Sequence, residues 1–589
     1  MFVFDYKISF KKKICFFIFS LFFLGYFASS QIVEGVSNVP ITEQTISLDI
    51  LPDNVTFWSD YPNDILARTL VDRMSDEELL AQIFMFGWAG QEPSELLNQW
   101  VEQRGLGSVK VFGWNTDNIN LVAKSITSLQ EKSQSRRFQI PLYVATDQEG
   151  GWIRHVKGET SDTPGNLAIG ASGYPADAWY SGFYISRELR ALGINMNFAP
   201  TVDLYTNHNS SVIGPRSFGE NSTFSGILGA AFSAGSLAAG VIPTAKHFPG
   251  HGDTGIDSHG NLPIISIDYD TLLNRELVPF KYLIEENIPA IMSGHLSFPK
   301  IVQNGEPASL SKTFLTEILR GVLGYKGLII TDDMMMNGAT MWAGSLSAAF
   351  RMAIEAGNDI IISSTTAQLN EALWTSNIAL MKTSDVFKER VKDAACRVIF
   401  SKLEYFKGKN PVPMYPDISK ISECIPDPEG KQFFLSQACR SITVYKSSEF
   451  PYKPNNNERI LLAGQKQYPE FFEEGKKRYP NAKMLQFNYA MGPNETEWMS
   501  NYIRELASGY DTVICCVADN ASALVASQLK SMGVKTIIVS VLSPVPSMKL
   551  SSWADTVIMA YSYSPYSFNA VFGALAGEFK VRGTLPLAE

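Results

Sequence analysis

A short segment rich in glycine and proline carries the densest group of reactive side chains in the sequence. Between Ala245 and Pro263 lie three histidines, two aspartates and a lysine. Glycine and proline break helices, so this segment is expected to be a loop that follows a strand. Within it, Asp257 and His259 are two residues apart, which places both side chains on the same side of an extended chain. A carboxylate beside an imidazole can raise the pKa of the imidazole, so the pair predicts a proton donor that works near neutral pH.

The same loop offers a metal site as an alternative, because His247 and His251 are four residues apart. That spacing presents two ligands on one side only when the chain is helical. Pro249 and Gly250 stand between the two histidines and disfavour a helix. The sequence also contains no Cys-x-x-Cys pair. We therefore expect neither a metal nor another cofactor.

A second candidate lies in the segment GLIITDDMMMNGA, which runs from Gly327 to Ala339. An apolar strand there ends at Thr331 and is followed by Asp332 and Asp333. A carboxylate at the end of a strand can attack an anomeric carbon and form a covalent glycosyl intermediate. An aspartate in this place also commonly opens the next helix. With two aspartates both roles can be filled, and we assign Asp332 as nucleophile and Asp333 as structural partner.

The elements that must position these residues form a repeating pattern between about residues 80 and 365. Eight short apolar runs each end in polar or glycine residues, and most are followed by a helix-like segment. The runs are Gln82–Trp88, Ser108–Gly113, Pro141–Gly150, Asn195–Leu204, Val241–His251, Ala290–Phe298, Leu328–Asp333 and Asp359–Ser363. Strands that alternate with helices pair in parallel, and eight such units predict an α/β fold of the (β/α)8 (TIM) barrel type. Reactive side chains gather at the ends of these runs, on the face where barrel enzymes place their active sites. They are Asp147, Asp203, Lys246, His247, His295 and Asp332.

The barrel is expected to span residues 61–375, followed by a helical connector and linker over 376–430 that ends in a stretch rich in proline and charge. Over residues 431–589, five apolar runs separated by helix-like segments predict a smaller, doubly wound α/β sandwich domain. These runs are Ile442–Tyr445, Ile460–Ala463, Thr512–Val517, Thr536–Val541 and Thr556–Ala560. All six histidines lie in the barrel range, so catalysis by imidazole belongs to the first domain.

The first thirty residues differ from the rest and predict a signal peptide for export. Four lysines between positions 7 and 13 precede an apolar run from Ile14 to Ala28. That run is short for a membrane-spanning helix and typical of a signal-peptide core. Cleavage is expected before Gln31, with residues 31–60 forming an N-terminal extension. The protein is therefore expected in the periplasm or outside the cell, with an uncleaved membrane anchor as the alternative.

Composition narrows the possible partners. The 589 residues are 45% hydrophobic and 12% aromatic, enough for two or three domains with large cores. The net charge of −9 gives no general attraction for nucleic acid or for an anionic membrane, so we expect neither as a partner beyond the export signal. The five cysteines after the signal have no regular spacing and do not predict a disulfide framework.

Five segments together resemble glycoside hydrolase family 3, and most of all the two-domain, exported form of its peptidoglycan-recycling β-N-acetylglucosaminidase branch. The segments are TDQEGG, NMNFAPTVDL, GPRSFG, KHFPGHGDTGIDSH and ITDDMMMNGA, in this order along the predicted barrel. The resemblance implies hydrolysis of terminal β-linked N-acetylglucosamine with retention of configuration. The implied substrates are cell-wall muropeptides or chitooligosaccharides.

The resemblance also implies roles for the residues that match. Asp332 would form the glycosyl intermediate, and His259, supported by Asp257, would be the acid/base. Most other branches of the family take the acid/base from a glutamate in the second domain, so the Asp–His pair marks this branch. The sequence departs from many relatives at Trp152, where an arginine is common. The implied sugar-binding residues are Asp147, Arg154, Arg216, Lys246 and His247.

Two other functions are compatible with these residues. A glycoside phosphorylase of the same fold is one, because a histidine acid has no anionic form that would repel phosphate. A glycan-binding protein that has lost catalysis is the other, although Asp332, Asp257 and His259 are all present. Product analysis with and without phosphate distinguishes a phosphorylase from a hydrolase. Turnover of a chromogenic N-acetylglucosaminide distinguishes an enzyme from a glycan-binding protein.

Overall fold

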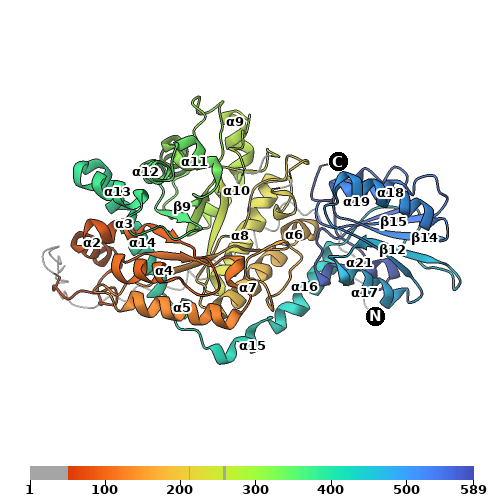
Figure 1. Cartoon of the computed structure of the whole chain (residues 1–589), viewed down its shortest axis with the longest axis horizontal. Coiled ribbons are helices and arrows are strands. Elements are labelled where there is room, and N and C mark those ends of the chain that lie inside the picture. The colour runs from red at the N-terminus through yellow and green to blue at the C-terminus, as the bar shows by residue number, and fades with distance from the viewer. Residues whose placement is uncertain (1–50, 211, 256–259, 589) are drawn as a thin grey trace, which may run out of the picture. The chain divides into compact units, whose positions relative to one another are not determined.

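The computed structural model describes residues 51–210, 212–255 and 260–588, and Asp53–Glu589 form one compact unit (Figure 1). The predicted signal peptide lies outside the described residues, as does most of the predicted N-terminal extension. Within the described ranges, no helix combines the length and the apolar character needed to cross a membrane.

Eight parallel strands close into a barrel, which confirms the fold predicted from the alternation of apolar runs and helices. Each strand lies within one of the eight predicted runs. The strands are β1 (Phe84–Phe86), β2 (Ser108–Lys110), β3 (Tyr143–Thr146), β6 (Met196–Asn197), β7 (Ile242–Phe248), β8 (Ala290–Ser293), β9 (Leu328–Asp333) and β10 (Ile360–Ser363). Helices cover the outside of the barrel, so nearly every strand residue is buried, and this is why the strands read as continuous apolar runs.

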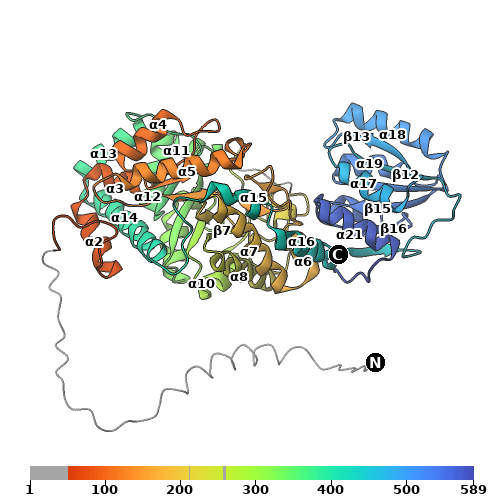
Figure 2. The same cartoon turned by 90° about the horizontal axis from the view of Figure 1, so that it is seen from below.

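The covering helices surround the strands in both views of the molecule (Figures 1 and 2). They include α5 (Ile119–Gln134), α6 (Asn166–Ser172), α7 (Pro175–Ala191), α8 (Ser222–Ala238), α10 (Val278–Glu285), η6 (Thr313–Val322) and α12 (Leu346–Ala356). Helix α5 shows the local cause of such an element. The Asn118 side chain caps its first turn by accepting hydrogen bonds from two backbone N–H groups. Its buried residues Val122, Ile126 and Leu129 recur at helical spacing and face the barrel.

The second domain contains a six-stranded sheet in the order β11-β16-β15-β14-β12-β13. The strands are β11 (Thr443–Ser447), β12 (Ile460–Gln465), β13 (Lys483–Phe487), β14 (Thr512–Val517), β15 (Lys535–Ser540) and β16 (Thr556–Met559). β11 is antiparallel to β16, and the other neighbours are parallel. The five predicted runs correspond to five of these strands, and β13 was not predicted. β13 is an edge strand in which only Leu485 and Phe487 are buried, so it lacks an apolar run.

Helices cover both faces of this sheet, as the doubly wound prediction requires. Helices α18 (Pro493–Ala507) and α19 (Asn520–Ser527) pack on one face. Helices α17 (Pro469–Arg478) and α21 (Pro565–Ala576) pack on the other. Neighbouring strand residues face opposite layers, so Cys515 lies in the first core and Cys516 in the second.

The range predicted as a connector divides into two parts. Helix α14 (Asp385–Phe406) packs against α2 (Asn63–Arg73) and α3 (Asp76–Gln82), so it belongs to the barrel. Residues 407–427 carry only short helices. Helix α16 (Pro428–Ser441) then contacts α6 and α7 of the barrel and α21 of the second domain, and so joins the two.

The C-terminal segment returns to the barrel. The backbone N–H of Glu220 donates to the carbonyl of Pro586 at 3.1 Å, and the Glu220 carboxylate accepts from the backbone N–H of Ala588 at 2.9 Å. Tyr205 and Ser543 also share a hydrogen bond of 2.7 Å between their hydroxyl groups. Contacts from the second domain therefore hold Tyr205 and Glu220, which lie on either side of Arg216 in the sequence.

Candidate active site

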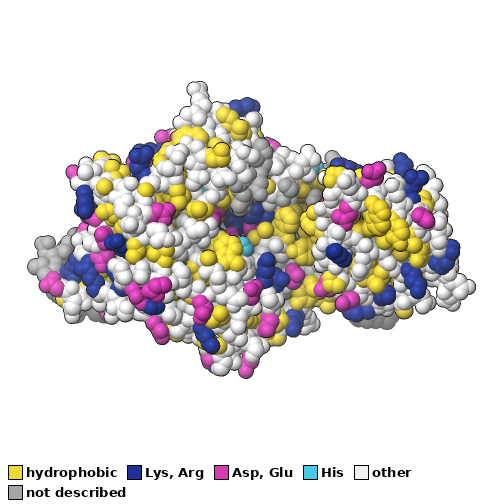
Figure 3. Space-filling model, viewed as in Figure 1, with side chains coloured by type: hydrophobic (Ala, Val, Ile, Leu, Met, Phe, Trp, Pro, Cys, Tyr) yellow, Lys and Arg dark blue, Asp and Glu magenta, His cyan; other side chains and the backbone are white. Residues whose placement is uncertain are grey.

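Side chains at the carboxyl ends of the barrel strands line a cavity of about 380 Å³. Figure 3 shows a hollow in which basic side chains and a histidine gather. Five of the predicted site residues line this cavity, namely Asp147, Arg216, Lys246, His247 and Asp332. The remaining lining residues are Lys110, Phe112, Trp114, Glu149, Ile153, His155, Val212, His251, Asp333, Met336 and Ser364. The described lining therefore comes entirely from the barrel.

Asp147 directly follows strand β3 and is held between two lysines. Its Oδ2 lies 2.8 Å from Nζ of Lys110, and its Oδ1 lies 2.6 Å from Nζ of Lys246. Burial alone would raise the pKa of Asp147, but the two lysines outweigh burial and hold the pKa well below its ordinary value. The carboxylate is therefore ionised and fixed in place, and it can accept hydrogen bonds from the hydroxyl groups of a ligand.

Glu149 extends this network to Arg216. Arg216 donates from Nε and Nη2 to the two carboxylate oxygens at 2.9 and 2.7 Å, and Nζ of Lys246 lies 2.7 Å from Oε1. Burial would raise the pKa of Glu149, but Arg216 and Lys246 prevail and lower it to about 2. The two parallel hydrogen bonds fix the plane of the guanidinium group, so Glu149 sets how Arg216 meets a ligand.

Replacing Glu149 by glutamine is expected to destabilise the protein, because two buried cations lose their shared counter-charge. Removing one partner of a buried ion pair typically costs about 3–5 kcal/mol, and we expect about 3 kcal/mol here, measured as the free energy of unfolding in urea. The matched control is Glu77→Gln, which breaks the more exposed ion pair with Arg104. That control should cost less than about 1 kcal/mol. Equal losses in the two variants would contradict a structural role for the buried network.

Strand β9 ends in the aspartate pair, and Asp332 presents a carboxylate oxygen to the cavity. Its Oδ1 accepts a hydrogen bond from the backbone N–H of Asp333 at 2.8 Å, and its Oδ2 lies 4.0 Å from Nε2 of His247. Burial would raise the pKa of Asp332, but His247 and His295 outweigh burial and lower it to about 2. No described residue donates a hydrogen bond to Oδ2. That oxygen is therefore negatively charged and available to a ligand.

Asp333 makes structural contacts instead. Its Oδ1 accepts hydrogen bonds from the backbone N–H groups of Met335 and Ser364, each at 3.0 Å, and these bonds fix the turn after β9. His295 supports the same turn, because its Nε2 donates to the Asp333 carbonyl at 3.1 Å while Nδ1 lies 2.7 Å from Oγ of Ser309. Burial lowers the pKa of His295.

His247 is oriented by the buried Asp203. Its Nδ1 donates to Oδ2 of Asp203 at 2.6 Å, and the Asp203 carboxylate also accepts from the backbone N–H groups of His247 and His251. Burial would raise the pKa of Asp203, but His247 outweighs burial and lowers it. The hydrogen bond at Nδ1 leaves Nε2 of His247 directed toward Asp332 and toward Nη2 of Arg216, which is 3.5 Å away.

One predicted site residue lies outside this cavity, and two others cannot be placed because they are not among the described residues. Arg154 does not line it, because its Nη1 donates to the carbonyl of Thr160 at 2.6 Å and its Nη2 lies 3.7 Å from Asp162. Asp257 and His259 lie outside the described residues, so their role as acid/base pair stays a prediction.

The sequence analysis missed two charged residues of the cavity, Lys110 and Glu149. Lys110 is the one charged residue in the apolar run 108–113. A buried charge needs a partner, so its position was a usable signal. Glu149 stands two residues after Asp147, a spacing that places both carboxylates on one side of an extended chain.

Comparison with known proteins groups the chain with sugar-cleaving enzymes. The family model described as the glycosyl hydrolase family 3 N-terminal domain matches residues 75–400. A β-hexosaminidase A of Pseudoalteromonas piscicida is 37% identical over 282 residues, which are 45% of this chain and 47% of that protein. The chain thus spans about half the length of this relative. A β-hexosaminidase of Neisseria gonorrhoeae (strain NCCP11945) is 33% identical over 292 residues, which are 48% of this chain and 77% of that protein.

The likeness in structure extends over both domains. A solved glycoside hydrolase family 3 β-N-acetylglucosaminidase from Paenibacillus sp. str. FPU-7 superposes with a TM-score of 0.79 and 27% sequence identity. The superposition covers 87% of this chain and 99% of that chain. The family model matches more than half of this chain, and the structure places an ionised carboxylate at the end of β9 beside a network of ion pairs. The chain therefore belongs to glycoside hydrolase family 3.

Proposed function

We propose that this protein is an exo-acting, retaining β-N-acetylglucosaminidase. The observation that carries the proposal is the state of Asp332, whose Oδ2 is ionised, free of protein donors among the described residues and exposed to the cavity. The relatives are a β-hexosaminidase A, a β-hexosaminidase and a β-N-acetylglucosaminidase, which supports an N-acetylated terminal sugar. We propose cell-wall fragments and chitooligosaccharides as the natural substrates that carry this terminal sugar.

The reaction takes two steps. In the first, Oδ2 of Asp332 forms a bond to the anomeric carbon while the bond from that carbon to the leaving oxygen breaks, and His259 gives its proton to that oxygen. In the second, water attacks the anomeric carbon, His259 takes a proton from the water, and the carboxylate of Asp332 is released. Asp257 orients the imidazole of His259 and favours its protonated form. Two inversions at one carbon retain the β configuration.

The network beside Asp332 holds the terminal sugar. Asp147 accepts hydrogen bonds from sugar hydroxyls, while Lys246 and Arg216 donate to them. Such charge-assisted bonds are roughly twice as strong as those between neutral groups. Because the cations are already paired with Asp147 and Glu149, the site is arranged before the ligand arrives. Little reorganisation is then needed at the moment of reaction.

A panel of chromogenic aryl β-glycosides tests the proposal. We expect the N-acetylglucosaminide to be cleaved with a kcat/KM at least about 10²-fold above those of the glucoside and the xyloside. The first sugar released should be the β anomer, observed by NMR. Added phosphate should leave the product unchanged, whereas formation of a sugar phosphate would assign a phosphorylase. Binding of N-acetylglucosamine without turnover of any glycoside in the panel would assign a glycan-binding protein.

A further inference from the structure

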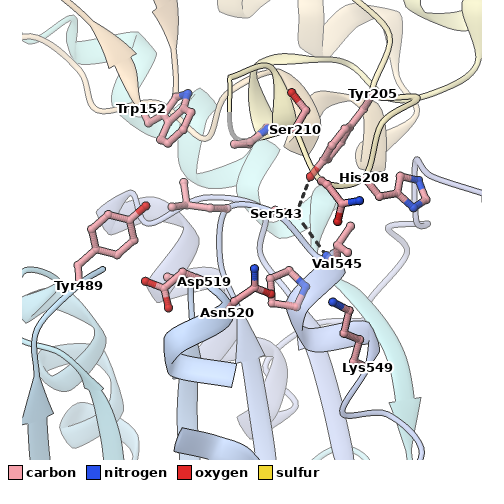
Figure 4. A pocket seen from close by; sticks show the side chains of 15 residues that line it. Trp152, Tyr205, His208, Ser210, Tyr489, Asp519, Asn520, Ser543, Val545 and Lys549 are labelled. Atoms are coloured by element: carbon pink, nitrogen blue, oxygen red, sulfur yellow. Dashed lines mark hydrogen bonds between the residues drawn. The ribbon is translucent and has the colours of Figure 1, made fainter. Parts of the chain in front are cut away.

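Trp152 stands at the tip of a small hairpin that leaves the barrel beside the candidate active site. The hairpin consists of β4 (Gln148–Gly150) and β5 (Ile153–Arg154), so Gly151 and Trp152 form its turn. Gly150 and Gly151 have φ angles of 88° and 61°, a backbone conformation that glycine adopts without strain. The turn presents the indole to the second domain, where it also lines a cavity of about 260 Å³ between that domain and the barrel (Figure 4).

By its contacts, the Trp152 indole belongs to the core of the second domain. It packs against the buried apolar cluster that lies between the six-stranded sheet and helices α17 and α21. Tyr468, Phe471 and Phe568 are members of this cluster. The indole Nε1 is buried and has no hydrogen-bond partner among the residues that the structure describes. Apolar packing therefore joins the tip of the hairpin to the second domain.

The base of the hairpin is fixed by the barrel instead. The backbone N–H and carbonyl of Gln148 bond to the side-chain amide of Asn197 in β6, each at 2.9 Å. At the turn, the backbone N–H of Gly151 donates to Oγ1 of Thr163 at 3.1 Å, while the next residue, Trp152, packs on the second domain. The hairpin is thus held at its base by the barrel and at its tip by both domains.

Between these two anchors the hairpin carries parts of the candidate site. Glu149, in β4, binds both Arg216 and Lys246 through its carboxylate oxygens. Ile153, the residue after Trp152, lines the candidate-site cavity. A shift of the hairpin tip would therefore move an apolar wall of the site and change the direction of the Arg216 guanidinium group.

We propose that Trp152 is a positioning residue for the terminal sugar, because its packing on the second domain holds the hairpin where Glu149 and Ile153 shape the candidate site. This assignment rests on the proposed function, since it takes the cavity beside Asp332 as the place of that sugar. Trp152 does not itself line that cavity. The second domain thereby contributes to binding in a cavity whose described lining comes from the barrel alone.

Inhibition by free N-acetylglucosamine tests this role, because this ligand has no group on the leaving-group side that could contact Trp152. Trp152→Ala should raise the inhibition constant, measured against hydrolysis of an aryl N-acetylglucosaminide, about tenfold, since a misplaced hairpin weakens the contacts of the terminal sugar. Trp152→Phe should restore it to within about twofold of wild type, because phenylalanine keeps an aromatic ring in the packing and lacks only the indole N–H. Trp152→Leu should give an intermediate value and serves if the alanine variant does not fold.

The kinetic constants separate positioning from general damage. In Trp152→Ala, KM for the aryl N-acetylglucosaminide should rise in parallel with the inhibition constant, while kcat changes less than about threefold. The matched control is Phe579→Ala, because Phe579 packs on the same core of the second domain but does not line the candidate-site cavity. This control should lower the midpoint of unfolding in urea and leave KM and the inhibition constant within about twofold of wild type.

An unchanged inhibition constant in folded Trp152→Ala would overturn the assignment, as would equal losses in Trp152→Ala and Trp152→Phe. A similar loss in Phe579→Ala would show that any damage to the second domain has this effect. A loss confined to oligosaccharide substrates would also contradict the assignment, since the indole would then act on the leaving-group side. Failure of the proposed function would show separately, as a wild-type protein that neither cleaves the aryl N-acetylglucosaminide nor binds N-acetylglucosamine.

Discussion

Replacing Asp332 by asparagine is expected to lower kcat on an aryl N-acetylglucosaminide by about 10⁴-fold or more. An amide cannot displace the leaving group or hold the anomeric carbon as an ester. The fold should survive, because the hydrogen bond that Oδ1 accepts from the Asp333 N–H can be accepted equally by an asparagine oxygen. Unfolding midpoints close to wild type would separate lost chemistry from lost structure.

The neighbouring aspartate is the matched control. Asp333→Asn keeps an oxygen that can accept the backbone hydrogen bonds from Met335 and Ser364, so activity should fall less than about tenfold. If Asp333→Asn abolished turnover and Asp332→Asn spared it, the nucleophile would be the second carboxylate of the pair.

The charge of Asp332 should not limit activity near neutral pH. Its pKa in the folded protein is lowered from the ordinary value of 3.8 to about 2. A lowered carboxyl pKa stabilises the folded protein above the ordinary value, and this contribution is lost as the pH falls from about 4 through 2. Asp332 is therefore ionised throughout the range in which the protein would work. A fall in kcat/KM between pH 4 and 6 would report a different group.

The fold was readable from the sequence because each barrel strand is buried on both faces. Such strands appear as uninterrupted apolar runs, and helices with their own periodicity separate them. The edge strand β13 lacks this signal, since solvent covers part of it and only Leu485 and Phe487 are buried. The connector was harder to divide, because helix α14 follows the last barrel strand yet packs on α2 and α3 near the start of the barrel. Contacts between distant segments leave no local pattern.

The positions of two site residues could be predicted because a strand fixes their direction. Asp147 directly follows β3, and Asp332 is one of the last two residues of β9. Arg154 is different, because it lies in the small antiparallel hairpin of β4 (Gln148–Gly150) and β5 (Ile153–Arg154). The register of that hairpin shifts between Gln148 and Gly150. The Arg154 guanidinium group contacts Thr160 and Asp162. A motif match alone does not carry that information.

The second domain offers a competing acid/base candidate, the carboxyl group of Asp519, which lines a cavity between that domain and the barrel. Both of its oxygens already accept backbone hydrogen bonds, and Oδ1 caps helix α19. These bonds give Asp519 a structural role at the start of the helix. The variant Asp519→Asn keeps an N-cap residue of comparable strength and removes the charge, which makes it the matched control for the acid/base prediction.

His259→Ala is expected to lower turnover of an unactivated disaccharide by about 10²- to 10⁴-fold, the usual range for general acid–base catalysis. An activated aryl glycoside should lose much less, because its phenolate departs with little help from a proton. Asp257→Ala should give a smaller loss with the same dependence, since Asp257 orients and charges the imidazole without transferring the proton itself. The measurement is kcat/KM across aryl N-acetylglucosaminides of rising leaving-group pKa, which should fall more steeply for both variants than for wild type and for Asp519→Asn. Equal losses on activated and unactivated substrates would make His259 a binding residue. A steep dependence in Asp519→Asn would instead move the acid to the second domain.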